Sequence, residues 1–413
     1  GMFGIAIWNQ ETQELTLARD RLGKKPLYWV QTGGGITFAS EVKALSAVGL
    51  LGDIDPVATL MFLRTDSTPT PMTMWTNAKK LVPGTALVWH PKRTTRCVRF
   101  WDPESAERGE GMNDAWQEAL EDDLERAVRK RLMADVPVGV FLSSGVDSSL
   151  VATLAAEHCM DQLHSFTLRF DDDSYDESEI AENNAALLGF EHHNVYASQA
   201  KMANAIDQLV ETYDEPLNDP ACLVMLTLSE EASSYVKVVL TGDGGDELFL
   251  GYPHAKLHKV MSNLPSSFYQ VARLMAPVLS SWPDKGQYFG LGFKAQRLAR
   301  GLSEADWIAR DLAWRGAYSK GQAAELLNPE LLASSPPGSV EDFLRDVARG
   351  VNFGDDLLTQ WSWLYLRTYL LDTVLVKVDR ATMAFGVEAR SPLLDQMVVE
   401  RALGMTARQR GQG

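Results

Sequence analysis

The chain has 413 residues, 45% of them hydrophobic, which is enough for two or three domains with packed cores. Its formal net charge of −16 argues against a nucleic-acid surface, which needs clustered basic residues. No run of 18 apolar residues and no signal-peptide pattern occur, so we expect a cytoplasmic protein without membrane contact. Three widely spaced cysteines (Cys97, Cys159 and Cys222) fit a reduced compartment better than a disulfide framework or a zinc site.

Residues 1–101 are predicted to form an antiparallel, β-rich α+β domain. Strands are expected at 3–8, 15–19, 86–90 and 98–101, with a hairpin over 29–38 and a short helix at 57–63. The hairpin turns through three glycines, residues 33–35. Because they lead into no helix, a turn is favoured over a phosphate-binding loop.

A polar stretch, residues 102–112, carries Pro and Gly without periodicity and is predicted to be a linker. It is followed by an amphipathic helix over 113–132, with Asn113 as its expected N-cap. The apolar stripe of this helix consists of Trp116, Leu120, Leu124 and Val128. A second domain is therefore expected over residues 113–413.

An apolar run, Val136–Leu142, shows no polar alternation, which is typical of a strand buried on both faces of a parallel sheet. A turn rich in serine and glycine (residues 143–149) follows, and then a helix over 150–158. Free N–H groups and the dipole at such a helix N-terminus favour an anion. The Walker pattern GxxxxGK[ST] is absent, which argues against that kind of nucleoside triphosphatase. A serine-rich turn capped by Asp147 or Ser148 is the alternative.

Strands and helices alternate beyond this turn, which predicts a doubly wound α/β sheet. Strands are expected at 163–170, 192–196 and 236–240, and helices at 178–188, ended by Gly189, and at 200–213. The acidic run 171–179 fails the EF-hand spacing, so a solvated loop is favoured there.

A second corner, Gly242-Asp243-Gly244-Gly245-Asp246-Glu247, follows the strand at 236–240. In an open α/β sheet both corners would lie at the carboxyl ends of strands, where ligands bind. Carboxylates there would repel a polyphosphate without a hard cation, and Mg²⁺ bound by Asp147 and Asp246 meets that need. A plain Gly/Asp turn is the alternative.

The stretch 372–395, DTVLVKVDRATMAFGVEARSPLLD, contains Lys377 and Arg380 three residues apart. On a helix these two cations would share one side and could neutralise charge developing on pyrophosphate. A structural pair with Asp372 and Asp379 is the alternative.

The first corner resembles the SGGxDS pyrophosphate loop of ATP pyrophosphatases, with Ser144 in place of the first glycine. Together with GDGGDE, KVDRATM and GVEARSPLLD, it makes residues 113–400 resemble the glutamine-dependent asparagine synthetases. The resemblance implies a doubly wound α/β domain of the ATP-pyrophosphatase type. It also implies activation of aspartate by ATP as an acyl-adenylate, followed by attack of ammonia to give asparagine.

Carried over residue by residue, the resemblance assigns ATP contacts to Leu142, Ser143, Ser144, Gly145, Val146, Asp147, Ser148, Ser149, Leu168, Thr241 and Gly242. It assigns Mg²⁺ to Asp147 and Asp246, and catalysis to Asp243, Lys377 and Arg380. Asp243 falls where some relatives carry a glutamate for the ammonia proton. Arg380 aligns better with the lysine of some relatives, but an arginine would act only as a charge clamp.

Residues 1–101 resemble the later half of the class II glutamine amidotransferase domain, an N-terminal-nucleophile fold. The likeness rests on RDRLGKKPLY at residues 19–28, FASEVKAL at 38–45 and Pro83-Gly84. The family nucleophile is a cysteine after the initiator methionine, whereas this sequence opens Gly1-Met2-Phe3. We therefore expect that the 413-residue chain does not hydrolyse glutamine and that ammonia serves in its place.

The acceptor is less clearly indicated, because Asp219 falls where some aspartate-using relatives carry an arginine for the substrate carboxylate. Aspartate is the first expectation. The alternatives are amidation or cyclisation of another carboxylate, such as a sugar acid or a β-lactam precursor, and a non-catalytic ATP-binding remnant. Small-molecule substrates, with no nucleic acid, are the expected partners, and a homodimer is one assembly that the resemblance permits.

Overall fold

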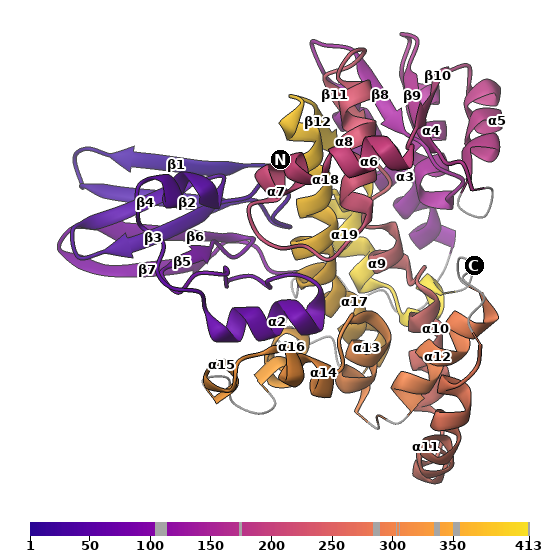
Figure 1. Ribbon diagram of the computed structural model, residues 1–413. Helices are drawn as coiled ribbons and strands as arrows, with labels where there is room; N and C mark the ends of the chain where they lie inside the picture. Colours follow the sequence, from indigo (N-terminus) through magenta and orange to yellow (C-terminus); the bar gives the residue numbers. More distant parts are fainter. Residues whose placement is uncertain are drawn as a thin grey trace.

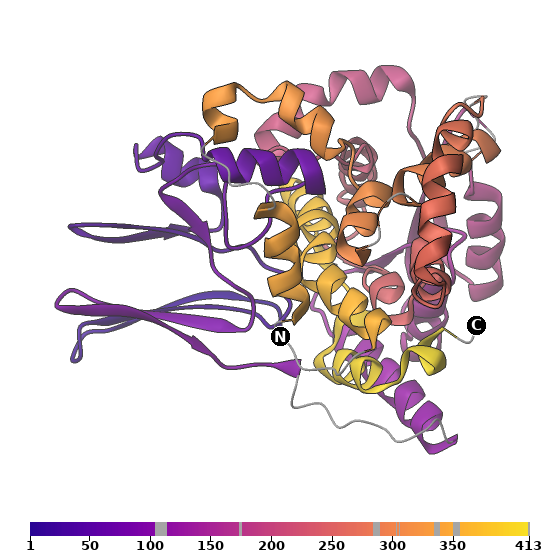
Figure 2. The same ribbon diagram turned by 90° about the horizontal axis from the view of Figure 1, so that it is seen from below.

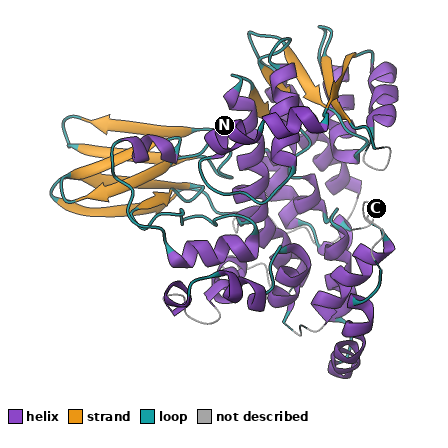
Figure 3. Ribbon diagram, viewed as in Figure 1, coloured by secondary structure: helices purple, strands orange, loops and turns teal. Residues whose placement is uncertain are grey.

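A computed structural model describes residues 1–103, 114–172, 176–283, 290–302, 304, 306–333, 339–349 and 356–411. Most of the predicted linker, with the expected cap Asn113, lies outside the described residues. Figures 1 and 3 show a β-rich part built from the first hundred residues beside a larger, mainly helical part that contains a sheet of its own. Among the described residues, no helix combines the length and apolar composition that crossing a bilayer requires.

The N-terminal part contains two antiparallel sheets, which Figure 2 shows as two separate layers. One sheet has the order β1-β2-β6-β7 and the other β4-β3-β5. The strands are β1 (Gly4–Asn9), β2 (Glu14–Arg19), β3 (Tyr28–Thr32), β4 (Gly35–Ala39), β5 (Ala78–Lys80), β6 (Thr85–His90) and β7 (Arg93–Arg99). Leu17 and Leu87 from one sheet pack with Leu27 and Leu81 between the layers. The α+β prediction is confirmed.

Two details of this part differ from the sequence-based prediction. Strand β7 begins at Arg93, five residues before the predicted start, because residues 93–99 pair with β6 in one long hairpin. Helix α1 (Val42–Ala47) was not predicted. The short helix predicted at 57–63 is α2 (Pro56–Thr65), and Asp55 caps it by accepting from two backbone N–H groups.

The larger part is built on a five-stranded parallel sheet with the order β10-β9-β8-β11-β12. The strands are β8 (Val138–Phe141), β9 (His164–Arg169), β10 (Glu191–Tyr196), β11 (Val238–Leu240) and β12 (Glu388–Arg390). Numbered along the chain, this order is 3-2-1-4-5, so the predicted doubly wound arrangement is confirmed.

The sheet is buried on both faces, as the unbroken apolar runs predict. In β8, Val138 and Val140 pack on one side and Phe141 on the other. Helices α3 (Asp114–Leu132), α4 (Val146–His158), α5 (Ser178–Leu188) and α19 (Gln396–Gly404) cover the first face. On the second face lie α6 (Gln199–Asn204), α7 (Ile206–Tyr213), α8 (Ala221–Ala232) and α18 (Leu375–Ala384).

The helix predicted over 200–213 is two helices, α6 and α7, which meet at Ala205. The remaining helices form a layer below the sheet in Figure 1. They are α9 (Gly245–Phe249), α10 (Pro253–Ser262), α11 (Ser266–Ser280), α12 (Leu291–Leu302), α13 (Trp307–Arg315), α14 (Lys320–Leu326), α15 (Pro329–Ala333), α16 (Ser339–Arg349), α17 (Leu357–Arg367) and α20 (Ala407–Arg410). A π-helical turn, η2 (Leu370–Val374), joins α17 to α18.

Helix η2–α18 lies against both parts of the molecule. From the N-terminal part, Lys25 Nζ lies 2.7 Å from Asp379, and Thr70 donates to the buried Asp372 from its backbone N–H and its hydroxyl, at 2.8 and 2.6 Å. Lys24 Nζ donates to the carbonyl of Ser391 at 3.0 Å. The two parts are therefore held together by buried polar contacts.

Candidate active site

The candidate site lies where the strand order of the parallel sheet reverses. Strands β8 and β11 are adjacent and parallel, but the chain continues from β8 to β9 on one side and from β11 to β12 on the other. This reversal opens a crevice at the carboxyl ends of β8 and β11. The two corners singled out from sequence follow these two strands, although about a hundred residues separate them along the chain. They line one open cleft with a volume of about 940 Å³.

Helix α4 begins earlier than predicted, inside the first corner. Gly145, with extended backbone angles, is the N-cap, so residues 146–149 are helical rather than part of the loop. Ser148 Oγ ties the corner together, because it accepts from Ser143 N at 3.2 Å and lies 2.9 Å from Ser143 Oγ. The first helical N–H groups have no intrahelical acceptor and open onto the cleft beside Asp147, as an anion site requires.

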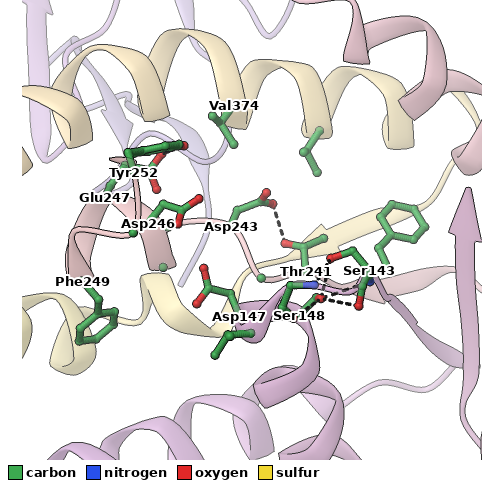
Figure 4. Close-up of a pocket in the computed structure, with 18 of the residues that line it drawn as sticks. Ser143, Asp147, Ser148, Thr241, Asp243, Asp246, Glu247, Phe249, Tyr252 and Val374 are labelled. Carbon is green, nitrogen blue, oxygen red and sulfur yellow. Dashed lines mark hydrogen bonds between the residues drawn. The ribbon is translucent and has the colours of Figure 1, made fainter. Parts of the chain in front are cut away.

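Three carboxylates converge between the corners, and Figure 4 shows those of Asp147, Asp243 and Asp246 directed into the same space. The corners touch: a Cβ on Gly245 would lie 2.2 Å from Asp147 Oδ2, and one on Gly242 would lie 2.7 Å from Ser148 N. At Gly242 the backbone of the first corner occupies the space of a side chain, so glycine is needed there, whereas a side chain at Gly245 would displace the Asp147 carboxylate.

Electrostatics in the cleft disfavour three ionised carboxylates. Burial, with the charges of Asp246 and Asp243, raises the pKa of Asp147 to about 6. Burial also raises the pKa of Asp246 and that of Asp243, although Thr241 donates to Asp243 at 2.6 Å. Such a cluster of oxygen ligands beside an anion-binding helix end fits Mg²⁺, which combines one or two carboxylates with phosphate oxygens.

Lys377 extends from α18 toward the cleft, one turn beyond the π-helical segment. Its ammonium lies 2.7 Å from Asp219 Oδ2, and both side chains are mostly buried. Burial alone would lower the pKa of Lys377, but Asp219 raises it above the usual value, so the side chain is charged at neutral pH. Tyr213 donates to the Lys377 carbonyl at 3.0 Å and fixes this turn of helix.

Arg380 does not line the cleft. It donates to the Ser40 carbonyl at 2.8 Å, lies 3.2 Å from Glu41 and sits over the ring of Tyr28, all in the N-terminal part. A spacing of three residues separates two side chains by about 60° around a helix, enough for these long side chains to reach different neighbours. The expectation that Arg380 acts beside Lys377 on the ligand is therefore not supported by its position.

Most of the other predicted residues line the cleft: Leu142, Ser143, Gly145, Val146, Asp147, Ser148, Leu168, Thr241, Gly242, Asp243 and Asp246. Ser144 and Ser149 do not. Ser144 donates to Glu177 at 2.6 Å, and Ser149 accepts from Asn184 at 3.3 Å.

Sequence reasoning missed cleft residues on elements without a motif. To the predicted Leu168 the lining adds Thr167 at the end of β9 and, from α8, Met225 and Leu228, which gives the cleft an apolar wall. The signal that could have found this wall is the strand order, since the end of β9 lies next to the corner after β8. Tyr252, which donates to Glu247 at 2.9 Å, and the exposed Lys256 line the opposite side.

The fold and the site together define a doubly wound α/β domain whose switch-point crevice is lined by three carboxylates and the N-terminus of α4. Residues 119–413 match the family model described as asparagine synthase, and the chain belongs to this family. Residues 1–101 match the model described as a glutamine amidotransferase domain.

Curated relatives resemble the chain over almost its whole length. Asparagine synthetase [glutamine-hydrolyzing] 1 of Bacillus subtilis (strain 168) is 29% identical over 97% of this chain and 61% of its own length. Asparagine synthetase [glutamine-hydrolyzing] 3 of the same organism is 26% identical over 97% and 60%. Amidase chry2 of Gibberella zeae is 26% identical over 97% and 62%. The chain thus spans about 60% of the length of these relatives.

Proposed function

We propose that the chain forms an amide in two steps that ATP drives at the switch-point cleft. A substrate carboxylate oxygen attacks the α-phosphorus of ATP, which gives an acyl-adenylate and releases pyrophosphate. The nitrogen of ammonia then attacks the acyl carbon, AMP leaves, and the nitrogen loses a proton to a base. The observation that carries this proposal is the meeting of Asp147 and Asp246 beside the N-terminus of α4.

The roles follow from position. The first corner binds the pyrophosphate through Ser143, Ser148 and the free N–H groups of α4, while the apolar wall at the end of β9 takes the adenosine. Asp147 and Asp246 would hold Mg²⁺, which neutralises phosphate charge when bound. Lys377 stabilises the charge that develops on the leaving pyrophosphate.

Asp243 is the proposed base for the ammonia proton. Asp243 is half-buried, and desolvation raises the pKa of its carboxyl, so it holds a proton more readily than an exposed aspartate. Because hydrogen bonds from Thr241 and Ser391 orient it, the group stays at one place beside the cleft.

Aspartate is the first proposed acceptor. A second candidate is a carboxylate without a further negative group, and the Lys377–Asp219 pair favours it. Aspartate brings an α-carboxylate that needs a cation, and Asp219 already pairs with the ammonium of Lys377. The relative named as an amidase is consistent with an acceptor other than aspartate.

The deciding experiment measures pyrophosphate release from ATP–Mg²⁺ with ammonium chloride and a panel of carboxylic acids. The panel contains aspartate, β-alanine, succinate and uronic acids, and amide products are identified by mass spectrometry. Asparagine as the main product supports the first proposal, and an amide of an acid with a single carboxylate, such as β-alanine or a uronic acid, supports the second. Lack of ATP–Mg²⁺ binding in calorimetry would contradict both proposals and indicate that the chain is a non-catalytic remnant. Supplying ammonia removes any dependence on glutamine hydrolysis, which we propose this chain does not perform.

A further inference from the structure

We infer that the chain carries a second metal site, for Zn²⁺ or a similar d-block ion, made by His164, Glu191 and His193. The site lies at the amino ends of β9 and β10, at the edge of the sheet opposite the ATP cleft. One ligand atom from each of the three side chains lies within 4.8 Å of the other two.

The parallel register brings these side chains to one face. His164 pairs with Glu191 and Phe166 pairs with His193, and residues that pair directly point to the same side of a sheet. His192 lies between Glu191 and His193 and points to the other face, where it contacts Ser165 at 2.9 Å. Of the two histidines on this strand, His193 therefore belongs to the cluster and His192 does not.

The separations fit a small ion. His164 Nδ1 lies 3.1 Å from His193 Nε2, and each of these nitrogens lies 3.8 Å from an oxygen of Glu191. A tetrahedral ion with bonds of about 2.0–2.1 Å holds its ligand atoms about 3.4 Å apart. The two 3.8 Å distances go to different oxygens of Glu191, so this half-exposed carboxylate must turn toward the imidazoles to complete the site. A plain N–H···N hydrogen bond between two neutral rings is the competing account of the 3.1 Å contact.

The surroundings favour a cation. The Nε2 atom of the His193 ring faces both His164 Nδ1 and the carboxylate of Glu191. The acidic groups near this ring are Glu191 and Glu231. The His193 ring stacks on the buried Phe166 with 4.9 Å between centroids and on Tyr235 with 4.1 Å, which fixes its orientation.

The site is also accessible. The side chains of His164 and His193 are 20% and 14% exposed, and that of Glu191 is 51% exposed, so an ion can enter from solvent. Two imidazoles and one carboxylate select a borderline ion such as Zn²⁺ rather than Mg²⁺, and water would fill the fourth position. Because β10 is an edge strand, the ion would fasten it to β9.

The test is calorimetric titration of Zn²⁺ into the chelator-treated 413-residue chain. All proteins carry Asp147→Asn and Asp246→Asn, so that cleft carboxylates do not contribute. We expect one equivalent bound with micromolar or tighter affinity, and a loss of at least about tenfold in His164→Ala and His193→Ala. His192→Ala, on the same strand but the opposite face, is the matched control and should bind as the parent does.

Two further measurements guard against misfolded variants. Glu191→Gln changes an exposed side chain, leaves the fold intact and should still weaken Zn²⁺ binding. Co²⁺ bound to the parent should give a visible absorption spectrum typical of imidazole-bound, four-coordinate Co²⁺, and His193→Ala should lose it. Equal Zn²⁺ affinity in parent, His193→Ala and Glu191→Gln, or no binding to the parent, would leave only the hydrogen bond and overturn the inference.

Discussion

Lys377 and Asp219 form a mostly buried ion pair of 2.7 Å at the wall of the cleft, although 158 residues separate them in sequence. Lys377 is the residue that we propose stabilises the leaving pyrophosphate, and Asp219 is the residue that bears on the choice of acceptor. The Asp219 carboxylate balances the charge of the Lys377 ammonium before any substrate binds. A ligand that needs Lys377 must therefore compete with Asp219.

A double substitution separates the structural role of this pair from its chemical role. Lys377→Met removes charge stabilisation and should lower pyrophosphate release at least about a hundredfold. It also leaves the mostly buried Asp219 without its charged partner, with only the Ala221 N–H still donating to it, which should lower the free energy of unfolding by about 3 kcal/mol. Adding Asp219→Asn should restore most of that stability but none of the activity, as measured by urea unfolding and pyrophosphate assays. Recovery of activity in the double variant would show that Lys377 serves only the fold.

Protonation of Asp147 should control Mg²⁺-dependent ATP binding. Because its pKa is raised to about 6, the carboxylate is protonated in much of the protein at pH 5 and ionised at pH 7.5. ATP–Mg²⁺ affinity should therefore fall as the pH drops through about 6, and Asp147→Asn should weaken binding and flatten this dependence. Glu157→Gln, at the exposed far end of the same helix, is the control and should keep the wild-type profile.

The same pKa shift has an opposite effect on the stability of the ligand-free chain. A carboxyl whose pKa is raised by folding binds more protons in the native state, so its contribution to stability is lost as pH rises from about 4 to 6. Mg²⁺ should relieve the repulsion among Asp147, Asp243 and Asp246 only where they are ionised. We expect a larger rise in Tm on adding Mg²⁺ at pH 7.5 than at pH 5. An equal rise at both pH values would contradict a shared cation among these carboxylates.

Gly245→Ala should damage the cleft without removing any functional group. The new Cβ would lie 2.2 Å from Asp147 Oδ2, so the Asp147 carboxylate must move from its place in the cleft. We expect ATP–Mg²⁺ affinity to fall at least about tenfold, since a misplaced metal ligand costs most of its contribution. Gly321→Ala, a helical position with open space around it, should bind normally and be slightly more stable. Similar binding by both variants would show that the corners do not act together.

Arg380→Ala should affect the contact between the two parts of the molecule and not the chemistry. The guanidinium contacts Ser40, Glu41 and the ring of Tyr28, so its loss should destabilise the fold by about 1–3 kcal/mol. With ammonia supplied, pyrophosphate release should stay within about threefold of wild type at 25 °C, while limited proteolysis of residues 1–101 becomes faster. A hundredfold loss of activity in a folded Arg380→Ala protein would restore the catalytic role inferred from its alignment.

The sequence predicted the two corners and the doubly wound sheet because each depends on local features. An unbroken apolar run followed by glycine and acidic residues identifies a buried strand and its carboxyl end, and alternation with helices implies the parallel sheet. The register that brings Asp147 to Gly245 follows from that topology, so the meeting of the corners could also be predicted. Each corner lies within a short window of the chain, whereas their meeting follows from the strand order that the α/β alternation implies.

Other features depend on distant partners and could not be predicted. The direction of Arg380 is set by Ser40 and Glu41, 340 residues away in the case of Ser40, and no helical spacing contains that information. The pairing of Asp219 with Lys377 likewise appears only in the folded chain. The helices over residues 253–349 carry no chemical motif, so the sequence indicated neither their number nor their place.

The buried Asp372 in the π-helical turn depends on donors from the other half of the molecule. Thr70 supplies two hydrogen bonds to it, and Lys80 Nζ lies 3.7 Å away. A fragment trimmed to the parallel-sheet half would retain this carboxylate but lose all three groups, at the base of the helix that bears Lys377. Dissecting the chain into independent modules would therefore disturb the turn that leads into Lys377, and we expect both halves to melt in one calorimetric transition.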